Sequence, residues 1–147
     1  MKSKLKLLSL AAGIALALSG TSVLAAGKYD VGANDKEVKV GNIVPYSGPA
    51  SAYGAIGKAI AAYFKGVNEQ GGINGRQINF ISLDDGYSPP KTVEQARKLV
   101  EQEKVLFLAA TLGTPTNTAI HKYMNKKKVP HIFVNTGAHK WGDYGTY

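Results

Sequence analysis

The apolar residues between positions 38 and 134 form four short groups, and longer groups with helical spacing separate them. The short groups predict strands, and they lie at residues 38–44, 78–83, 105–110 and 132–134. The third group, Val105 to Ala110, is a continuous apolar run, which is typical of a strand buried on both faces.

Three helices are predicted between these strands. The first runs from about residue 53 to 69 and ends before Gly71-Gly72, and Asn74-Gly75 then forms a tight turn. The second begins at Ser88-Pro89, with Ser as the N-cap, and the third begins at Thr114-Pro115. Apolar residues recur every three or four positions in the first helix (Tyr53, Ile56, Ile60, Tyr63, Phe64, Val67), share one face of the second (Val93, Ala96, Leu99, Val100) and are expected to point inward in the third (Ala119, Ile120, Tyr123, Met124).

This β-α-β-α-β-α-β order predicts an α/β fold, a doubly wound and mostly parallel sheet with helices on both faces. Ligands of such sheets bind at the carboxyl ends of the strands. That rule directs attention to residues 45–54, 84–88 and 111–115, and to the loop after Val134.

The first 26 residues have the pattern of a secretory signal peptide. Three lysines precede an apolar run from Leu7 to Leu18, and the small residues Ala25 and Ala26 offer cleavage sites. The run is shorter than the roughly 20 residues of a transmembrane helix, although an uncleaved anchor is the alternative. We therefore predict export to the periplasm with cleavage after Ala25 or Ala26, followed by a flexible mature N-terminus at residues 27–36.

Composition narrows the classes of function. The 147-residue chain has no cysteine, which excludes disulfides and cysteine metal sites. Its net charge of +8 falls to +5 once the three N-terminal lysines are removed. The remaining basic residues are scattered apart from residues 126–128, so no nucleic-acid partner is predicted.

Five segments at or near the strand ends carry a resemblance. They are Pro45–Pro49 with Tyr53-Gly54, Asn68–Arg76, Asp84–Pro89, Thr111–Asn117, and Val129-Pro130. In this order and spacing the chain resembles the periplasmic leucine/isoleucine/valine-binding protein family, the type I substrate-binding proteins of ABC importers. The match runs from residue 37 to about 142.

The resemblance implies the N-terminal lobe, at residues 37–140, of a two-lobe clamp that closes on its ligand by a hinge. Residues 141–147 would be the truncated start of the crossover to the second lobe. It also implies a small-molecule ligand such as an amino acid or related carboxylate, the membrane subunits of an ABC importer as partners, and no enzymatic activity.

The resemblance further implies which residues touch the ligand. Thr114 aligns with the hydroxyl that holds the ligand carboxylate, and as an expected N-cap it would stand where a helix favours anions. Tyr53 aligns with an aromatic ligand contact, although it could simply pack at the start of the first helix. The other implied ligand-binding residues are Leu112, Gly113, Asn135, Thr136 and Gly137.

Two departures from the family pattern leave the ligand open. Gly137 stands where a threonine often occurs, and Leu112-Gly113 replace a more hydroxyl-rich run. Another small carboxylate or an aromatic acid is therefore an alternative to an amino acid. A truncated chain that does not bind alone, or an enzyme on a doubly wound sheet, are further alternatives.

No catalytic, metal or cofactor site is predicted. Asp84-Asp85 lack the further ligands of a metal pair and are expected to cap their loop. His121, His131 and His139 lack the spacing of a zinc site. Neither a G-x-G-x-x-G motif nor a G-x-S-x-G elbow is present, so the chain shows no nucleotide-binding or hydrolase signature.

Overall fold

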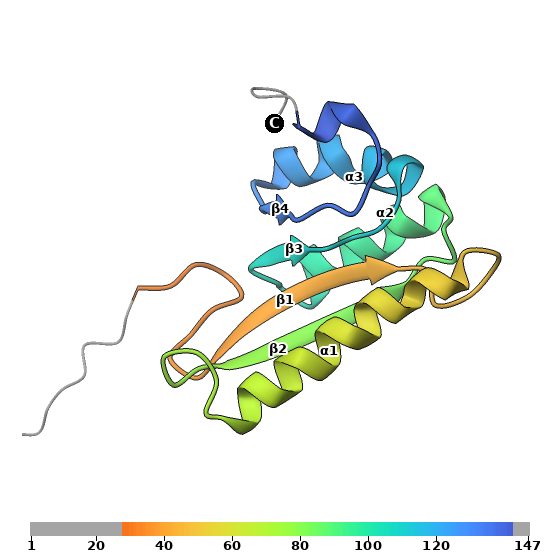
Figure 1. Ribbon diagram of the computed structural model, residues 1–147. Helices are drawn as coiled ribbons and strands as arrows, with labels where there is room; N and C mark the ends of the chain where they lie inside the picture. Colours follow the sequence, from red (N-terminus) through yellow and green to blue (C-terminus); the bar gives the residue numbers. More distant parts are fainter. Residues whose placement is uncertain (1–27, 143–147) are drawn as a thin grey trace, which may run out of the picture.

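The computed structural model describes residues 28–142, which form one parallel sheet with helices on both faces (Figure 1). The strands stand in the order β2-β1-β3-β4, and every pairing between them is parallel. Their bounds are β1 Glu37–Val44, β2 Gln77–Asp84, β3 Phe107–Ala109 and β4 His131–Ile132. The predicted fold class is confirmed. The predicted signal peptide, residues 1–26, lies outside the described residues.

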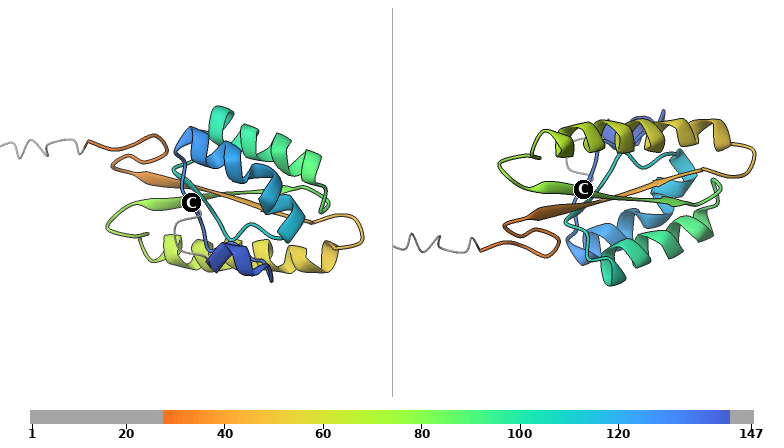
Figure 2. Two further views of the ribbon diagram at one scale, coloured as in Figure 1. Left: turned by 90° about the horizontal axis from the view of Figure 1, so that it is seen from above. Right: turned by 90° about the horizontal axis from the view of Figure 1, so that it is seen from below.

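Helix α1 covers one face of the sheet, and α2 and α3 pack side by side on the other (Figure 2). The α-helices are α1 Gly54–Glu69, α2 Pro89–Arg97 and α3 Thr114–Lys127, and α2 continues into a π-helical turn, η2 Lys98–Gln102. Two 3-10 turns, η1 Ser51–Tyr53 and η3 His139–Gly142, complete the described elements. In this part of the chain no helix combines the length and apolarity needed to cross a bilayer.

The hydrophobic core lies between the sheet and the α2–α3 layer. Ile43 and Leu108 point from the strands into this layer, where they meet Leu99 and Ile120, and all four are fully buried. Gly41 makes room for this packing, because a β-carbon there would lie 2.5 Å from Leu108 Cδ2. Alternation along β1 and β3 therefore sets which side chains fill the core.

Helix α1 packs closely against the carboxyl end of β1. A β-carbon at Gly57 would lie 2.9 Å from Val44 Cγ2 and would overlap the Tyr46 hydroxyl. Two apolar residues of the predicted repeat, Tyr53 and Tyr63, are instead 57% and 70% exposed. The spacing of apolar residues located α1 correctly, but only some of these apolar residues face the sheet.

Three predicted details are wrong. Ala119 is exposed, because α3 turns Asn117, Ile120 and Met124 toward the core instead. The strand predicted at 105–110 is reduced to Phe107–Ala109. The fourth strand occupies His131–Ile132 rather than 132–134, since Phe133 adopts a left-handed φ of 54° that ends the pairing and leaves its ring 80% exposed.

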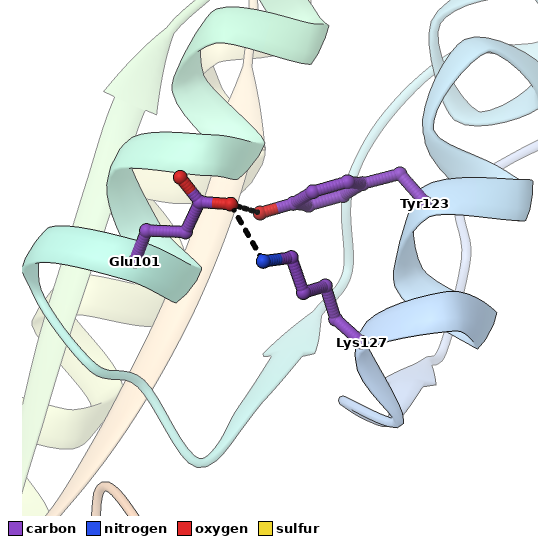
Figure 3. A network of polar contacts seen from close by, with 3 residues as sticks. All are labelled: Glu101, Tyr123 and Lys127. Carbon is purple, nitrogen blue, oxygen red and sulfur yellow. Dashed lines mark hydrogen bonds and ion pairs between the residues drawn. The ribbon is translucent and has the colours of Figure 1, made fainter.

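A polar contact ties η2 to α3 on the outside of the core (Figure 3). Glu101 accepts hydrogen bonds from the Tyr123 hydroxyl at 3.0 Å and from Lys127 Nζ at 2.9 Å. Burial, together with the hydrogen bond to Glu101, raises the pKa of Tyr123 to about 12. Glu101 and Lys127 are both well exposed, so their ion pair contributes little to the stability of the fold.

We expect Ile120→Ala to lower the free energy of unfolding by about 2–5 kcal/mol, because it leaves a cavity at the centre of the core. Ile73→Ala is the matched control, since Ile73 is 56% exposed and its truncation should cost less than about 1 kcal/mol. Urea denaturation of both variants measures the difference. Equal losses would contradict the placement of the core.

Candidate functional site

A cavity of about 340 Å³ lies among the loops that follow the four strands. All seven residues predicted to bind ligand line it, together with Ile56 and Tyr87: Tyr53, Leu112, Gly113, Thr114, Asn135, Thr136 and Gly137. A larger cavity, of about 510 Å³, lies beside β4 and is lined in part by His121, His131 and Trp141. None of the predicted ligand-binding residues lines the larger cavity.

Helix α3 begins at this cavity, and its N-cap lies one residue earlier than predicted. Gly113, not Thr114, is the N-cap, with a positive φ of 109° that favours glycine. The carbonyls before the helix are held by Thr116, whose hydroxyl contacts Leu112 O at 2.6 Å and Gly113 O at 3.0 Å. Thr114 is therefore the first helical residue, and its hydroxyl lies 2.8 Å from that of Thr136.

Two backbone amides at the start of α3 have no hydrogen-bond acceptor among the described residues. They are the amides of Thr114 and Thr116, and Pro115 has no amide hydrogen. These groups stand at the positive end of the helix dipole. Because Thr114 also lines the cavity, the arrangement suits a negatively charged ligand group.

A buried amide holds the loop from Thr111 to Gly113 in place. Asn117 is fully buried, and its Nδ2 donates to Gly113 O at 2.7 Å and to Thr111 O at 3.2 Å. Its Oδ1 accepts from the Thr111 hydroxyl at 2.6 Å. Since Thr111 has only that one proton, Nε2 of His131 must donate to the Thr111 oxygen.

His131 is half-buried, and its Nε2 carries the proton that bonds to Thr111. Burial, with a smaller contribution from the nearby His121, lowers the pKa of His131 from 6.5 to about 4. The sequence interpretation of His131 as a residue at a strand start is confirmed, and the side chain supports the loop rather than facing the cavity.

A second network holds the strand ends on the α1 face. Ser82 donates to Asn42 Oδ1 at 2.7 Å, while Asn42 Nδ2 donates to Ala109 O and Ala110 O at 2.9 and 3.0 Å. Asn135 Nδ2 also donates to Ala110 O, at 3.0 Å. Ala110 adopts a left-handed φ of 55°, and these amides stabilise the turn that it makes.

The two aspartates at the end of β2 cap loops, as predicted. Asp84 accepts hydrogen bonds from the amides of Tyr46, Ser47 and Gly86 and from the Ser47 hydroxyl. Asp85 is fully buried and accepts from Tyr87 N and the Thr92 hydroxyl. Within residues 28–142, no group of three or more His, Asp or Glu side chains is placed to hold a metal.

Partial burial acts to raise the pKa of Asp84, but the hydrogen bond from the Ser47 hydroxyl and those from the Gly86, Tyr46 and Ser47 amides outweigh it. They lower the pKa from 3.8 to about 2. The carboxylate therefore links the loop after β1 to the end of β2.

Sequence reasoning missed Tyr87 and Ile56. Ile56 follows Tyr53 by three positions, so helical spacing could have placed it beside Tyr53. Tyr87 lay inside a candidate loop, but its ring position depends on a left-handed φ of 63°. The ring lies against Gly113, where an added β-carbon would come within 2.6 Å of Tyr87 Cε2.

Comparison with known proteins places the chain among binding proteins. A family model described as periplasmic binding protein matches residues 37–147. A protein of Brucella abortus (strain 2308) named Leu/Ile/Val-binding protein homolog 1 is 38% identical over 91 residues, which are 61% of this chain and 22% of that protein.

Solved structures agree with this placement. A possible leucine/isoleucine/valine-binding protein from Rhodopirellula baltica SH 1 superposes with a TM-score of 0.67 at 27% identity, over 78% of this chain and 31% of that one. A solute-binding protein of an ABC transporter from Rhodopseudomonas palustris BisB5, in complex with 3,4-dihydroxy benzoic acid, gives a TM-score of 0.61 at 28% identity, over 69% and 28%. The chain spans less than a third of the length of each of these relatives.

Protonation of Asp84 should destabilise the fold. Its pKa is lower in the folded chain than the ordinary 3.8, so its contribution is complete above about pH 4 and is lost as the pH falls toward 2. We expect Asp84→Asn to be less stable than the parent chain at pH 6, and the difference in the free energy of unfolding to become smaller between pH 4 and 2. Urea unfolding of both chains at pH 6, 4 and 2 measures this difference.

Asp30→Asn is the matched control for this series. Asp30 is exposed, and among the described residues its carboxylate has no hydrogen-bond donor. Removal of this exposed carboxylate should change the free energy of unfolding by less than about 0.5 kcal/mol at pH 6. If the free energy of unfolding of Asp84→Asn does not approach that of the parent chain between pH 4 and 2, the role assigned to Asp84 is contradicted.

Proposed function

The chain belongs to the periplasmic-binding-protein family, and we propose that it is the N-terminal ligand-binding lobe of an extracytoplasmic substrate-binding protein that serves an ABC importer. The observation that carries this proposal is the convergence of the seven family-implied residues on one cavity at the start of α3. Residues 37–140 form this lobe, and residues 141–147 begin the crossover to the second lobe.

The proposed ligand is a small carboxylate. The amide of Thr114 and the hydroxyls of Thr114 and Thr136 offer hydrogen-bonding groups at the positive end of a 14-residue helix. The names of the relatives support this class, because branched-chain amino acids and 3,4-dihydroxy benzoic acid share a carboxylate. The second lobe would supply the opposite wall, so this lobe alone should bind weakly.

The remaining parts of the proposal follow from the sequence. Residues 1–26 direct export, cleavage after Ala25 or Ala26 releases the protein into the periplasm, and residues 27–36 form the mature N-terminus. The membrane subunits of the importer receive the loaded protein. The relatives are solute-binding proteins rather than enzymes, and we extend that role to this chain.

Thr114→Val should weaken carboxylate binding by about three- to tenfold, because it removes one hydroxyl that can bond to the ligand. Thr118→Val is the matched control, since it removes an exposed hydroxyl one turn further along α3. Amide chemical-shift titrations of the chain with leucine and with benzoate, at millimolar concentrations, measure the dissociation constants. If neither probe shifts any amide, or both variants respond alike, the proposal is contradicted.

A further inference from the structure

The site offers no charged partner for an amino group. None of the nine residues that line the cavity is acidic or basic. The nearest acidic pair in sequence, Asp84 and Asp85, is committed to loop amides and hydroxyls. An ammonium group in the cavity would therefore lie near the positive end of α3 without a counter-charge from the described residues, which costs binding energy.

The walls of the cavity suit an aromatic body. Tyr53 and Tyr87 keep 57% and 37% of their surface exposed, so their rings are accessible beside the cavity. Ile56 and Leu112 add aliphatic surface between the loops. Two tyrosines beside one cavity provide faces and edges on which a ligand ring can pack.

The hydroxyls of these two tyrosines are also available. Among the described residues, Tyr29, Tyr46 and Tyr123 bond through their hydroxyls to Asp35, Ser82 and Glu101. Tyr53 and Tyr87 have no such partner within residues 28–142. A ligand that covers them must either bond to the phenols or leave them unsatisfied.

We propose that this site selects a hydroxylated aromatic monocarboxylate that carries no amino group. The inference rests on the proposed function, because it takes the carboxylate to lie at the start of α3. The ring then packs against Tyr53 and Tyr87, and a ring hydroxyl bonds to their phenols.

Four probes built on one scaffold separate these features. 3-Phenylpropanoate is the reference, phenylalanine adds the ammonium group, 3-(4-hydroxyphenyl)propanoate adds the ring hydroxyl, and 3-cyclohexylpropanoate removes the aromaticity. Amide chemical-shift titration of the chain gives each dissociation constant. We expect phenylalanine to bind at least about tenfold more weakly than the reference, the cyclohexyl acid more weakly, and the hydroxylated acid about threefold or more tightly.

Variants test the two phenols. The double substitution Tyr53→Phe with Tyr87→Phe should abolish the difference between the hydroxylated acid and the reference. Tyr63→Phe is the matched control, because Tyr63 is an exposed tyrosine of α1 that does not line the cavity, and it should preserve the difference. A difference that persists in the double variant overturns the assignment of the phenols.

The outcomes distinguish this inference from the function beneath it. If phenylalanine binds as tightly as 3-phenylpropanoate, and Thr114→Val weakens both, the carboxylate site stands and the proposed selectivity is overturned. If none of the four acids shifts the amides of Thr114 and Thr136, the proposed function fails together with the selectivity.

Discussion

The carbonyl groups of Ala109, Ala110 and Thr111, at the carboxyl end of β3, are partly or fully buried and need hydrogen-bond donors, and three asparagine side chains donate to them. Asn42 donates to Ala109 O and Ala110 O, Asn135 to Ala110 O, and Asn117 to Thr111 O. An unsatisfied buried carbonyl costs about 1–3 kcal/mol, so these amides hold the strand end in one conformation. The position of Gly113, and with it the start of α3, depends on that conformation.

The other side of the cavity depends on a related constraint. Asp84 binds the amides of Tyr46 and Ser47 and so fixes the loop that carries Tyr53, while Asp85 fixes the turn that carries Tyr87. The charged groups near the site are therefore used to shape loops. What remains at the cavity surface is aromatic, aliphatic, hydroxyl and amide in character. This division explains why the site can favour an anion without a basic side chain.

Much of this organisation could be predicted from the sequence. Hydrophobic spacing located the strands and helices, and the rule for parallel sheets selected the loops that meet at the cavity. The errors occur where distant contacts decide the backbone. Ala110, Tyr87 and Phe133 adopt left-handed conformations that local propensity disfavours. The N-cap moved to Gly113, and Ala119 turned outward, because the Thr116 and Asn117 side chains bond to carbonyls before the helix.

The central claim is that a carboxylate ligand binds at the start of α3. Mapping the amide chemical-shift changes caused by 3-phenylpropanoate tests it most directly. The account predicts that the largest changes lie at the amides of Leu112, Gly113, Thr114 and Thr116 and of residues 135–137. Changes concentrated instead around the larger cavity beside β4, at His121, Met124 and Trp141, would contradict it.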